Sequence, residues 1–257
     1  MLQLQSSISD TQRYKNACQM AALNDFYFSF FKQNPDYTEI LEHVSEDQGR
    51  LYKEHLDQNF PEYISKLDKF KENDLYGGTK LFNYDGIGKI SPTTLRYIKV
   101  LSDLKQLYGN LDNFNIVEIG VGYGGQCKII SDFFNIQNYY LVDLDESLNL
   151  SEKYLNKLNV KNAKVIRPND IVSLNQKFDL IISNYAFTEI SKTIQEFYLN
   201  NIILKSNHGY ITCNFISQYC NIDSYSLKEL EAKLNNFSTK KLQEFPLTHK
   251  DNLILYW

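Results

Sequence analysis

The sequence predicts an α/β fold, in which a mostly parallel sheet carries helices on both faces and follows a helical N-terminal segment. Three observations support this prediction. Beyond residue 110, short apolar runs alternate with stretches of helical periodicity, as in parallel strands joined by helices. The first of these runs ends in a glycine-rich turn at residues 120–125. Before residue 73, the patterns are helical.

The N-terminal segment should form a helical cap over residues 1–72. Its helices are expected at residues 12–31, 37–44, 46–56 and 62–71. Ser45 and Gln48 fit a capping box, in which each side chain binds the other residue's backbone N–H, and Pro61 suits a first helical turn. The segment is dense in tyrosine and phenylalanine, which either pack as a helical core or cover the mouth of a ligand site.

Residues 73–110 are predicted to be a lid loop and a connecting helix. The loop, residues 73–90, is rich in glycine and aromatic side chains, Tyr84 among them. A long loop in a compact domain is more often functional than idle, so we expect it to close over a ligand and exclude water. A flexible linker is the alternative. Ser91 as N-cap and Pro92 in the first turn should start a helix that runs to about residue 108.

Residues 111–257 should form the sheet domain. Strands are predicted at residues 114–119, 139–142, 163–166, 178–182, 210–215, 241–245 and 253–257. Helices are predicted at residues 126–134, 190–204 and 226–234, and from a cap at Ser147 to residue 158. Residues 207–209 should stop the helix that begins at 190. Five strands joined by helices and a closing hairpin make a Rossmann-like, seven-stranded sheet.

The glycine-rich turn indicates a nucleotide-type cofactor, because glycine lets the backbone turn tightly and approach a ligand. Gly120, Gly122 and Gly125 fit the G-x-G-x-x-G of dinucleotide binding, with Asp143 where a ribose-binding acid belongs. Glu118, two residues before the first glycine, favours another cofactor. E/D-x-G-x-G-x-G resembles motif I of class I S-adenosylmethionine (SAM)-dependent methyltransferases. A purely structural turn is the remaining alternative.

A closer resemblance rests on four stretches: GKISPTTLRY at 88–97, VEIGVGYGGQ at 117–126, VDL at 142–144 and ISNYAFTE at 182–189. Together they resemble the sugar O-methyltransferase family over residues 73–257. That family is associated with bacterial surface-polysaccharide biosynthesis, including capsules. The resemblance implies a SAM-dependent enzyme that methylates a hydroxyl of a sugar, which is linked to a nucleotide or lipid or is part of a glycan.

The resemblance also assigns cofactor residues. Glu118 and the backbone of residues 120–124, namely Gly120, Gly122, Tyr123 and Gly124, would hold the methionine end of SAM.

Asp143 would accept hydrogen bonds from both ribose hydroxyls, since an ionised carboxylate offers two acceptor oxygens. Asp170 would bind the adenine amino group, and Asn169 is the alternative candidate for this contact. Asn184 follows the fourth strand and would contact the cofactor or orient substrate hydroxyls.

The general base is predicted from position in the sheet. Ligands of open α/β sheets lie outside the carboxyl ends of the strands. Glu189 and His249 fall on that edge and are the two candidates. Arg96, Tyr185 and Tyr84 are predicted to contact the substrate, with Arg96 suited to hydroxyls or a phosphate.

Three other histidines are set aside. His208 falls on the opposite edge of the sheet, and His43 and His55 belong to the cap, where we expect them to be solvated.

Composition argues against several classes of protein. A net charge of −4, a pI near 5.6 and four arginines argue against nucleic-acid binding. No apolar stretch reaches the length of a membrane span and no signal-peptide pattern opens the chain, so a cytoplasmic location is expected. The four cysteines show no C-x-x-C spacing and should be reduced. No metal site is expected, and the aromatic cap is compatible with a homodimer.

Several functions therefore stay open at this point. The first is sugar O-methylation. The second is methylation of another small polar acceptor, such as a phosphate-type glycan substituent or an amine. The third is a non-catalytic SAM-binding protein that partners an enzyme, which the intact motif disfavours. A dehydrogenase is a fourth, and it predicts binding of NADH.

Overall fold

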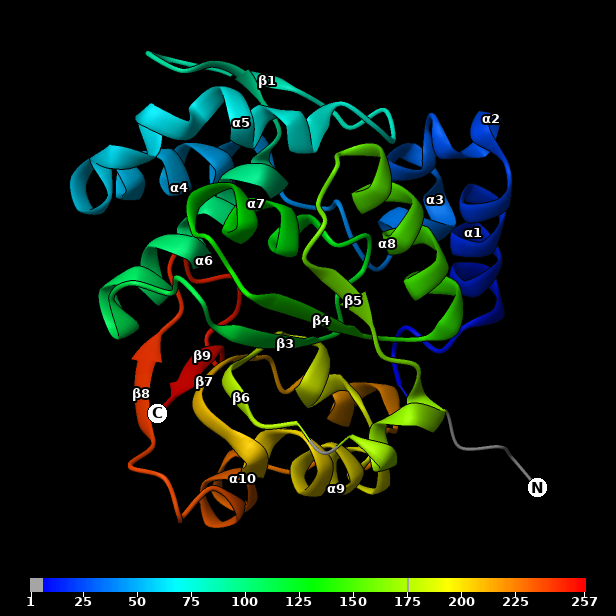
Figure 1. The fold of residues 1–257 in the computed structure, drawn as a ribbon, viewed down its shortest axis with the longest axis vertical. Helices are drawn as coiled ribbons and strands as arrows, with labels where there is room; N and C mark the ends of the chain where they lie inside the picture. Colours follow the sequence, from blue (N-terminus) through cyan, green and yellow to red (C-terminus); the bar gives the residue numbers. More distant parts are fainter. Residues whose placement is uncertain (1–6, 175) are drawn as a thin grey trace.

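The structure of the chain, a computed structural model, describes residues 7–174 and 176–257. Its centre is a seven-stranded sheet in the order β5-β4-β3-β6-β7-β9-β8 (Figure 1). The strands are β3 (Asn115–Ile119), β4 (Asn138–Val142), β5 (Ala163–Val165), β6 (Phe178–Asn184), β7 (Ser206–Cys213), β8 (Lys240–Gln243) and β9 (Leu253–Tyr256). β3 to β7 are parallel, and β9 runs antiparallel to both of its neighbours. The predicted fold class, α/β with a Rossmann-like, seven-stranded sheet, is confirmed.

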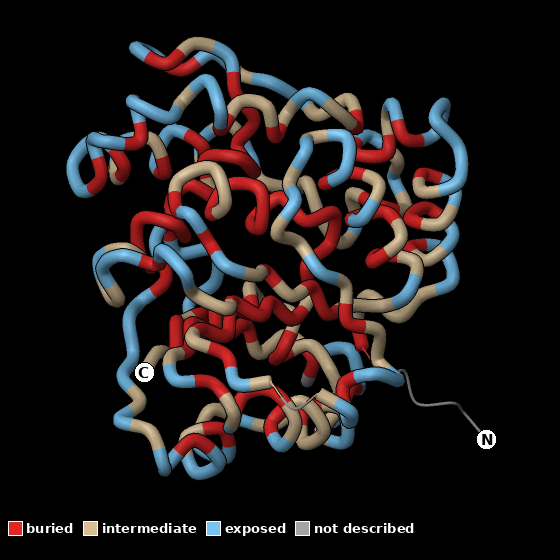
Figure 2. Tube along the Cα trace, in the orientation of Figure 1, coloured by how far each residue is buried: buried red, intermediate tan, exposed pale blue. Residues whose placement is uncertain are grey.

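Helices cover both faces of the sheet (Figure 1). α6, α7 and α8 lie on one face, and α9 and α10 on the other. Their bounds are Pro92–Tyr108, Gly125–Phe133, Asp145–Lys157, Lys192–Asn201 and Leu227–Lys233. Successive strand residues point to opposite faces, so Ile116 and Ile182 join the core on the α6 side, whereas Val117 and Ile181 join the core on the α9 side. Both faces of the central strands are therefore buried (Figure 2).

The N-terminal helices form a further layer outside α6 and α8 (Figure 1). They are α1 (Gln12–Leu23), α2 (Asp25–Phe28), α3 (Pro35–Thr38), α4 (Glu46–Asn59) and α5 (Leu67–Lys71), with 3₁₀ turns at Phe31–Gln33, Pro61–Lys66 and Glu72–Asp74. α1 packs on α8, and α4 packs on α6. Buried side chains of this layer, such as Cys18 and Phe31, belong to the same apolar cluster as those of the sheet. The division at residue 72 stays a prediction, and residues 1–6 lie outside the described residues.

Two predicted helix starts are confirmed, and two predicted helices differ in the structure. α3 ends at Thr38, so the helix predicted over residues 37–44 is wrong beyond its first two residues. Ser45 and Gln48 form the capping box of α4, and Ser91 caps α6 by accepting from Thr94 N–H. The predicted helix over residues 12–31 is wrong, because Asn24 ends α1 in an extended conformation and its side chain caps α2. Asparagine favours such caps because its side chain competes with the helical backbone hydrogen bonds.

Two boundaries in the sheet domain are also corrected. α8 begins at Asp145, ahead of Ser147, whose hydroxyl donates to the carbonyl of Gly122 (2.9 Å) instead of capping the helix. α9 ends at Asn201, and residues 207–209 lie inside β7 rather than in a stop signal. β7 starts early because its first residues pair with β6, a long-range contact that no local pattern reports.

The predicted lid segment folds as a small hairpin. β1 (Phe82–Tyr84) pairs antiparallel with β2 (Gly88–Ile90). Tyr84 is buried, and its hydroxyl donates to the carbonyl of Glu46 in α4 (3.3 Å). No residue of 73–90 lines the cavity described below, so a lid role for this segment has no support in the structure.

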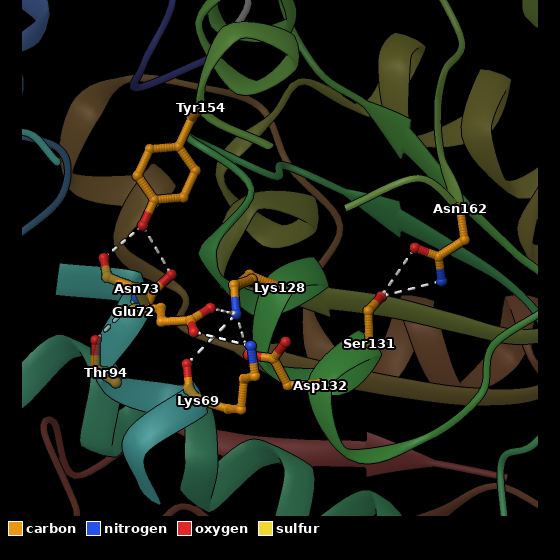
Figure 3. Close-up of polar contacts among 9 residues, drawn as sticks. All are labelled: Lys69, Glu72, Asn73, Thr94, Lys128, Ser131, Asp132, Tyr154 and Asn162. Carbon is orange, nitrogen blue, oxygen red and sulfur yellow. Dashed lines mark hydrogen bonds and ion pairs between the residues drawn. The ribbon is translucent and has the colours of Figure 1, made fainter. Parts of the chain in front are cut away.

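An ionic cluster centred on the buried Lys128 joins α7 to the N-terminal layer (Figure 3). It consists of Lys69, Glu72, Lys128 and Asp132 and is called the Lys128 cluster below. The Lys128 side chain is 1% exposed, and its ammonium lies 3.2 Å from Glu72 Oε2 and in contact with Asp132.

A second buried polar junction centres on Asn73, which lies just beyond the cluster (Figure 3). Its amide donates to Thr94 in α6 (2.8 Å), and its side-chain oxygen accepts from Tyr154 in α8 (3.0 Å). Its carbonyl accepts from the buried ammonium of Lys32 (2.9 Å). Saturated hydrogen bonding of this kind is what allows polar groups to be buried at an interface between helices.

Candidate functional site

The glycine-rich turn after β3 has the conformation that requires glycine. Gly120 and Gly122 have φ of 81° and 55°. A side chain at Gly120 would place its Cβ 2.1 Å from that of Ala186, in the segment after β6. The turn therefore packs directly against the carboxyl end of the neighbouring strand, and a side chain there would separate them.

Asp143 closes this turn from the end of β4. Its carboxylate accepts from the N–H groups of Gly122 (2.9 Å) and Leu144 (2.7 Å). Burial raises the pKa of the Asp143 carboxyl, against the opposing effect of these two N–H groups. Each carboxylate oxygen has a further lone pair, so Asp143 can accept hydrogen bonds from a ligand while it holds the turn.

Glu118, the last but one residue of β3, is almost fully buried at 2% exposure. Its Oε2 accepts from the hydroxyl of Tyr139 (2.8 Å). Burial raises the pKa of Glu118 to about 8, because a low-dielectric site disfavours the charged form. A cation placed beside it would reverse this effect, as an ammonium group stabilises the carboxylate.

A cavity of about 520 Å³ lies at this edge of the sheet. Its size falls within the range of small-molecule sites, roughly 300–1,000 Å³. Its walls consist of Ser7, Ile8, Ser9, Tyr14, Glu39, Ile40, Leu41, His43, Val44, Gln48, Tyr52, Arg96, Tyr97, residues 118–122, 142–144 and 184–186, Glu189, Ile190, Ile194, Tyr198, Asn214, Ile216, Thr248, His249 and Asn252. The carboxyl ends of β3, β4, β6 and β7 thus meet in one cavity, which the N-terminal layer covers.

The segment after β6 brings two predicted residues to the cavity. Asn184 Oδ1 accepts from Thr212 (3.2 Å), but its buried Nδ2 has no hydrogen-bond partner. Tyr185 has φ 69° and ψ −41°, a strained conformation for an aromatic residue. Its N–H bond to the carbonyl of Thr212 (2.8 Å) and its hydroxyl contact with Glu244 hold it there. Strained backbone and unpaired buried donors are typical of binding sites.

Both predicted general bases line the cavity, in different environments. Glu189 Oε1 accepts from the amide of Asn214, which follows β7. Burial raises the pKa of Glu189, and the Asn214 bond opposes that shift. His249 lies in the turn between β8 and β9, is 43% exposed and lies 3.7 Å from Asp251. Glu189 is the more firmly oriented of the two.

Arg96 reaches the cavity from the first turns of α6 and is half-buried. Its guanidinium carbon lies 5.5 Å from the ring centre of Tyr97 and 5.9 Å from that of Tyr185.

Two predicted residues of the glycine turn do not reach the cavity. Tyr123 is fully buried in the core, where its ring lies 4.1 Å from the ammonium of Lys32. Gly124 is the N-cap of α7 and packs against Leu155. The turn changes direction after Gly122, which sends the following residues inward.

Three further predicted site residues lie outside the cavity. Asn169 and Asp170 are exposed and do not line the cavity, because they follow β5, the edge strand of the sheet. Tyr84 points into the interface with α4, as described above, and is also absent from the cavity.

Some cavity residues were missed at the level of sequence. Asn214 follows β7, so the rule of strand carboxyl ends would have identified it. Tyr52, Gln48 and His43 come from the N-terminal layer, and no local signal marks them. His43 was expected to be solvated; it is exposed and still contributes to the cavity wall. Asn252 is buried, and its Oδ1 has no partner.

No group of three or more His, Cys, Asp or Glu side chains among the described residues is placed to hold a metal ion. Over residues 7–174 and 176–257, no helix combines the length and apolar character needed to cross a membrane. The four cysteines are free thiols, three of them buried.

No protein-family model and no curated protein sequence matches the chain. Solved structures with a similar fold include a SAM-dependent methyltransferase from Aquifex aeolicus, which is 16% identical over 62% of this chain and 87% of its own, with a TM-score of 0.45. TrmK of M. capricolum, in complex with S-adenosyl-homocysteine, is 18% identical over 60% of this chain and 66% of its own, with a TM-score of 0.43. The mitomycin 7-O-methyltransferase MmcR is 11% identical over 64% of this chain and 56% of its own, with a TM-score of 0.45. Similarities this weak carry no conclusion about activity.

Proposed function

We propose that this chain is a SAM-dependent O-methyltransferase that methylates a hydroxyl of a sugar. The observation that carries the proposal is the meeting of the glycine turn, Asp143 and Glu189 in one cavity. The first two suit a cofactor with a ribose and an amino-acid end, and the third suits a proton acceptor. The sequence resemblance supports a sugar of a bacterial surface polysaccharide, linked to a nucleotide or lipid or part of a glycan.

The residues of the cavity fit the cofactor. Bound SAM would supply a methyl group activated by its sulfonium, so that a C–O bond to the acceptor forms as the C–S bond breaks and S-adenosylhomocysteine leaves. Glu118 and the backbone at Gly120 and Gly122 would hold the methionine end, and Asp143 would accept from the ribose hydroxyls. The unpaired Nδ2 of Asn184 offers a donor to the same ligand.

The adenine ring would pack on an apolar wall instead of binding Asn169 or Asp170. The cavity lining offers Leu144, Ile190, Ile194 and Tyr198 for this role. An aromatic or aliphatic wall stabilises a flat base by burial and stacking.

Glu189 is the proposed general base. Asn214 occupies one carboxylate oxygen, and the other is available to accept the proton of the acceptor hydroxyl as the new C–O bond forms. A carboxylate with a raised pKa is a stronger base than an exposed one, which suits this role. His249 is the second candidate, as it lines the same cavity.

The acceptor would bind among the tyrosine rings of the cavity. Tyr52, Tyr97 and Tyr185 line it on the side of β6 and β7, and rings of this kind pack against the C–H faces of sugars. Another small polar acceptor, such as a phosphate-type substituent or an amine, fits the same wall. A non-catalytic SAM-binding role is disfavoured by the half-buried Glu189, which the Asn214 amide orients. A cytoplasmic location and a homodimer remain predictions.

Calorimetric titration with S-adenosylhomocysteine tests the cofactor site, with NADH as the competing ligand. We expect micromolar binding of S-adenosylhomocysteine to the wild type and an affinity at least about 10-fold lower in Asp143→Ala, since a hydrogen bond to a charged group contributes about 1.5–3 kcal/mol. Asp145→Ala is the matched control, because this neighbouring carboxylate is 58% exposed and lies outside the cavity. Thermal unfolding of each variant checks that the turn is intact.

Absence of S-adenosylhomocysteine binding, or binding of NADH in its place, would contradict the proposal. If the cofactor binds, methyl transfer to a panel of sugars and sugar nucleotides, followed by mass spectrometry, identifies the acceptor. An amine acceptor methylated in preference to every sugar would favour the second candidate function.

A further inference from the structure

We infer that the acceptor carries an anionic group, a carboxylate or a phosphate, and that Arg96 binds it. This inference rests on the proposed function and names the class of its substrate. It starts from the ion pairing of the arginines. Arg13, Arg50 and Arg167 each pair with a carboxylate, respectively that of Asp36, Glu46 and Asp145.

Arg96 differs from these three. Within residues 7–174 and 176–257, no carboxylate oxygen lies within 4 Å of its guanidinium, and no hydrogen bond to it is formed. The three paired arginines are 40–68% exposed, where water already solvates a charge. Arg96 is half-buried in a cavity, where a charge without a partner is costly.

Two carboxylates near Arg96 do not pair with it: Glu244, which shares a void with it, and Glu42, whose charge raises the pKa of Arg96 without coming within 4 Å. Glu244 is buried, and its two oxygens accept from the Tyr185 hydroxyl, from Thr248 and from the Asn252 amide. Glu42 Oε2 accepts from the hydroxyl of Thr79 (2.9 Å), and its buried Oε1 has no hydrogen-bond partner, from Arg96 or from any other described residue. The donors of Arg96 therefore remain available to a ligand.

Position in the sheet separates Arg96 from the ribose site. A small void of about 20 Å³ adjoins the cavity, and Arg96 lines both together with Asn184 and Tyr185. The other walls of that void include Thr212 of β7 and Ile254 of β9. β7 and β9 lie on the opposite side of β3 and β6 from β4, which carries the ribose-binding acid. Arg96 thus lies at the acceptor end of the cavity.

The chemistry of the guanidinium selects the ligand class. Its planar fork of N–H donors matches the two oxygens of a carboxylate or phosphate, and it has no acceptor for hydroxyl protons. The flanking rings of Tyr97 and Tyr185 restrict the rotation of the fork. A sugar acid and a sugar phosphate both present the required anion beside a ring that the tyrosines can cover.

Anion titrations of the wild type, Arg96→Gln and Arg50→Gln test the inference, with and without S-adenosylhomocysteine. The probes are acetate and inorganic phosphate against chloride at equal ionic strength, followed by glucuronate, glucose 6-phosphate and glucose. We expect saturable binding of acetate or phosphate to the wild type and to Arg50→Gln, and at least about 10-fold weaker binding to Arg96→Gln. The corresponding sugar anion should bind more tightly than glucose.

The two anion arms distinguish a carboxylate from a phosphate. Equal anion binding by the wild type and Arg96→Gln, or none by either, overturns the inference. A fall of the S-adenosylhomocysteine affinity in Arg96→Gln also overturns it, because Arg96 then serves the carboxylate of the cofactor. The anion titrations without cofactor test Arg96 independently of the proposed function. The proposed function itself fails if the wild type does not bind S-adenosylhomocysteine.

Discussion

Two buried polar regions of this molecule are built in opposite ways. In the Lys128 cluster, the ammonium has two carboxylate partners, and the carbonyl of Lys69 also accepts from it (3.4 Å). In the cavity, the guanidinium of Arg96 has no carboxylate partner among the described residues, and Asn184 Nδ2 has no acceptor. One region is complete without a ligand, and the other is not.

The difference indicates what each region contributes. Buried polar groups are normally paired, and a satisfied cluster such as that of Lys128 stabilises one arrangement of helices. An unpaired atom alone does not mark a site, since Gln126 Oε1 also lacks a partner and lies outside the cavity. The cavity is distinctive because unpaired groups coincide there with an unpaired charge, a strained backbone at Tyr185 and space for a ligand.

The largest expected effect is on activity, at Glu189. Glu189→Gln should lower the rate of methyl transfer by about 10²–10⁴-fold, because a general base typically contributes that much. The amide can still accept from Asn214, so thermal stability and S-adenosylhomocysteine affinity should stay unchanged. The wild-type rate should rise with pH through the raised pKa of Glu189, since only the ionised form accepts a proton. Steady-state kinetics across pH measures both effects.

His249→Gln is the control for this prediction. If it abolishes the rate while Glu189→Gln does not, the base is the histidine.

The next effect is on the pH dependence of stability, at Glu118. Its folded pKa of about 8 lies above the ordinary value of 4.5, so the folded state keeps a proton that the unfolded chain releases. Between these two values, the free energy of unfolding should fall by about 1.4 kcal/mol per pH unit through this group. Glu118→Gln cannot ionise, so its stability relative to the wild type should increase as the pH rises from 5 to 8.

Urea unfolding at several pH values measures this difference. The exposed Glu54→Gln serves as control and should show no such trend. A Glu118→Gln difference that does not change with pH would disprove the linkage.

A stability loss of intermediate size is expected in the Lys128 cluster. Lys128→Met leaves the largely buried carboxylate of Asp132 without its cation, whereas Glu72 keeps Lys69, and the loss should be about 3 kcal/mol. For a chain of this length the melting temperature should fall by about 6–12 °C. The affinity for S-adenosylhomocysteine at 25 °C should be unchanged, because the cluster lies outside the cavity.

Arg50→Met removes an ion pair of which both members are exposed, and it should cost less than about 1 kcal/mol. If Arg50→Met and Lys128→Met lower the free energy of unfolding equally, burial does not determine how much these two ion pairs stabilise the fold.

The smallest stability change is expected at Asn184. Asn184→Ala loses a single hydrogen bond, with Thr212, and should lower the free energy of unfolding by no more than about 1 kcal/mol. Affinity for S-adenosylhomocysteine should nevertheless fall, because the free Nδ2 is lost. Asn73→Ala is the matched comparison, as this asparagine is saturated within the protein. It should lose more stability and no affinity, and the reverse result would invalidate the contrast between the two regions.

Much of the sheet could be predicted from the sequence because its signals are local. The apolar runs of β3, β4 and β6 are short and bounded by polar or glycine residues, so their existence follows from burial on both faces. Glu118, Gly120 and Gly122 are adjacent in the chain, and their common place at the cavity follows from the turn itself. Asp143 was placed correctly because parallel neighbouring strands end at the same edge.

The failures concern long-range placement. Asn169 and Asp170 satisfy the same local rule as Asp143, but they follow the edge strand β5 and remain in solvent. Tyr84 was expected to meet a ligand and instead fills a gap against α4, where Gly49 leaves room for its hydroxyl. Which surface a loop residue meets depends on how distant elements pack, and no neighbour in sequence encodes that.

By itself, the sequence determined the strands, the glycine turn and the acidic residues that flank it, because these depend on short-range periodicity and backbone conformation. Only the tertiary structure decided which side chains share the cavity, which of them lack partners and how far burial raises the pKa of Glu118 and Glu189. Burial and pairing are properties of the packed chain, since they depend on every element that excludes water from a site.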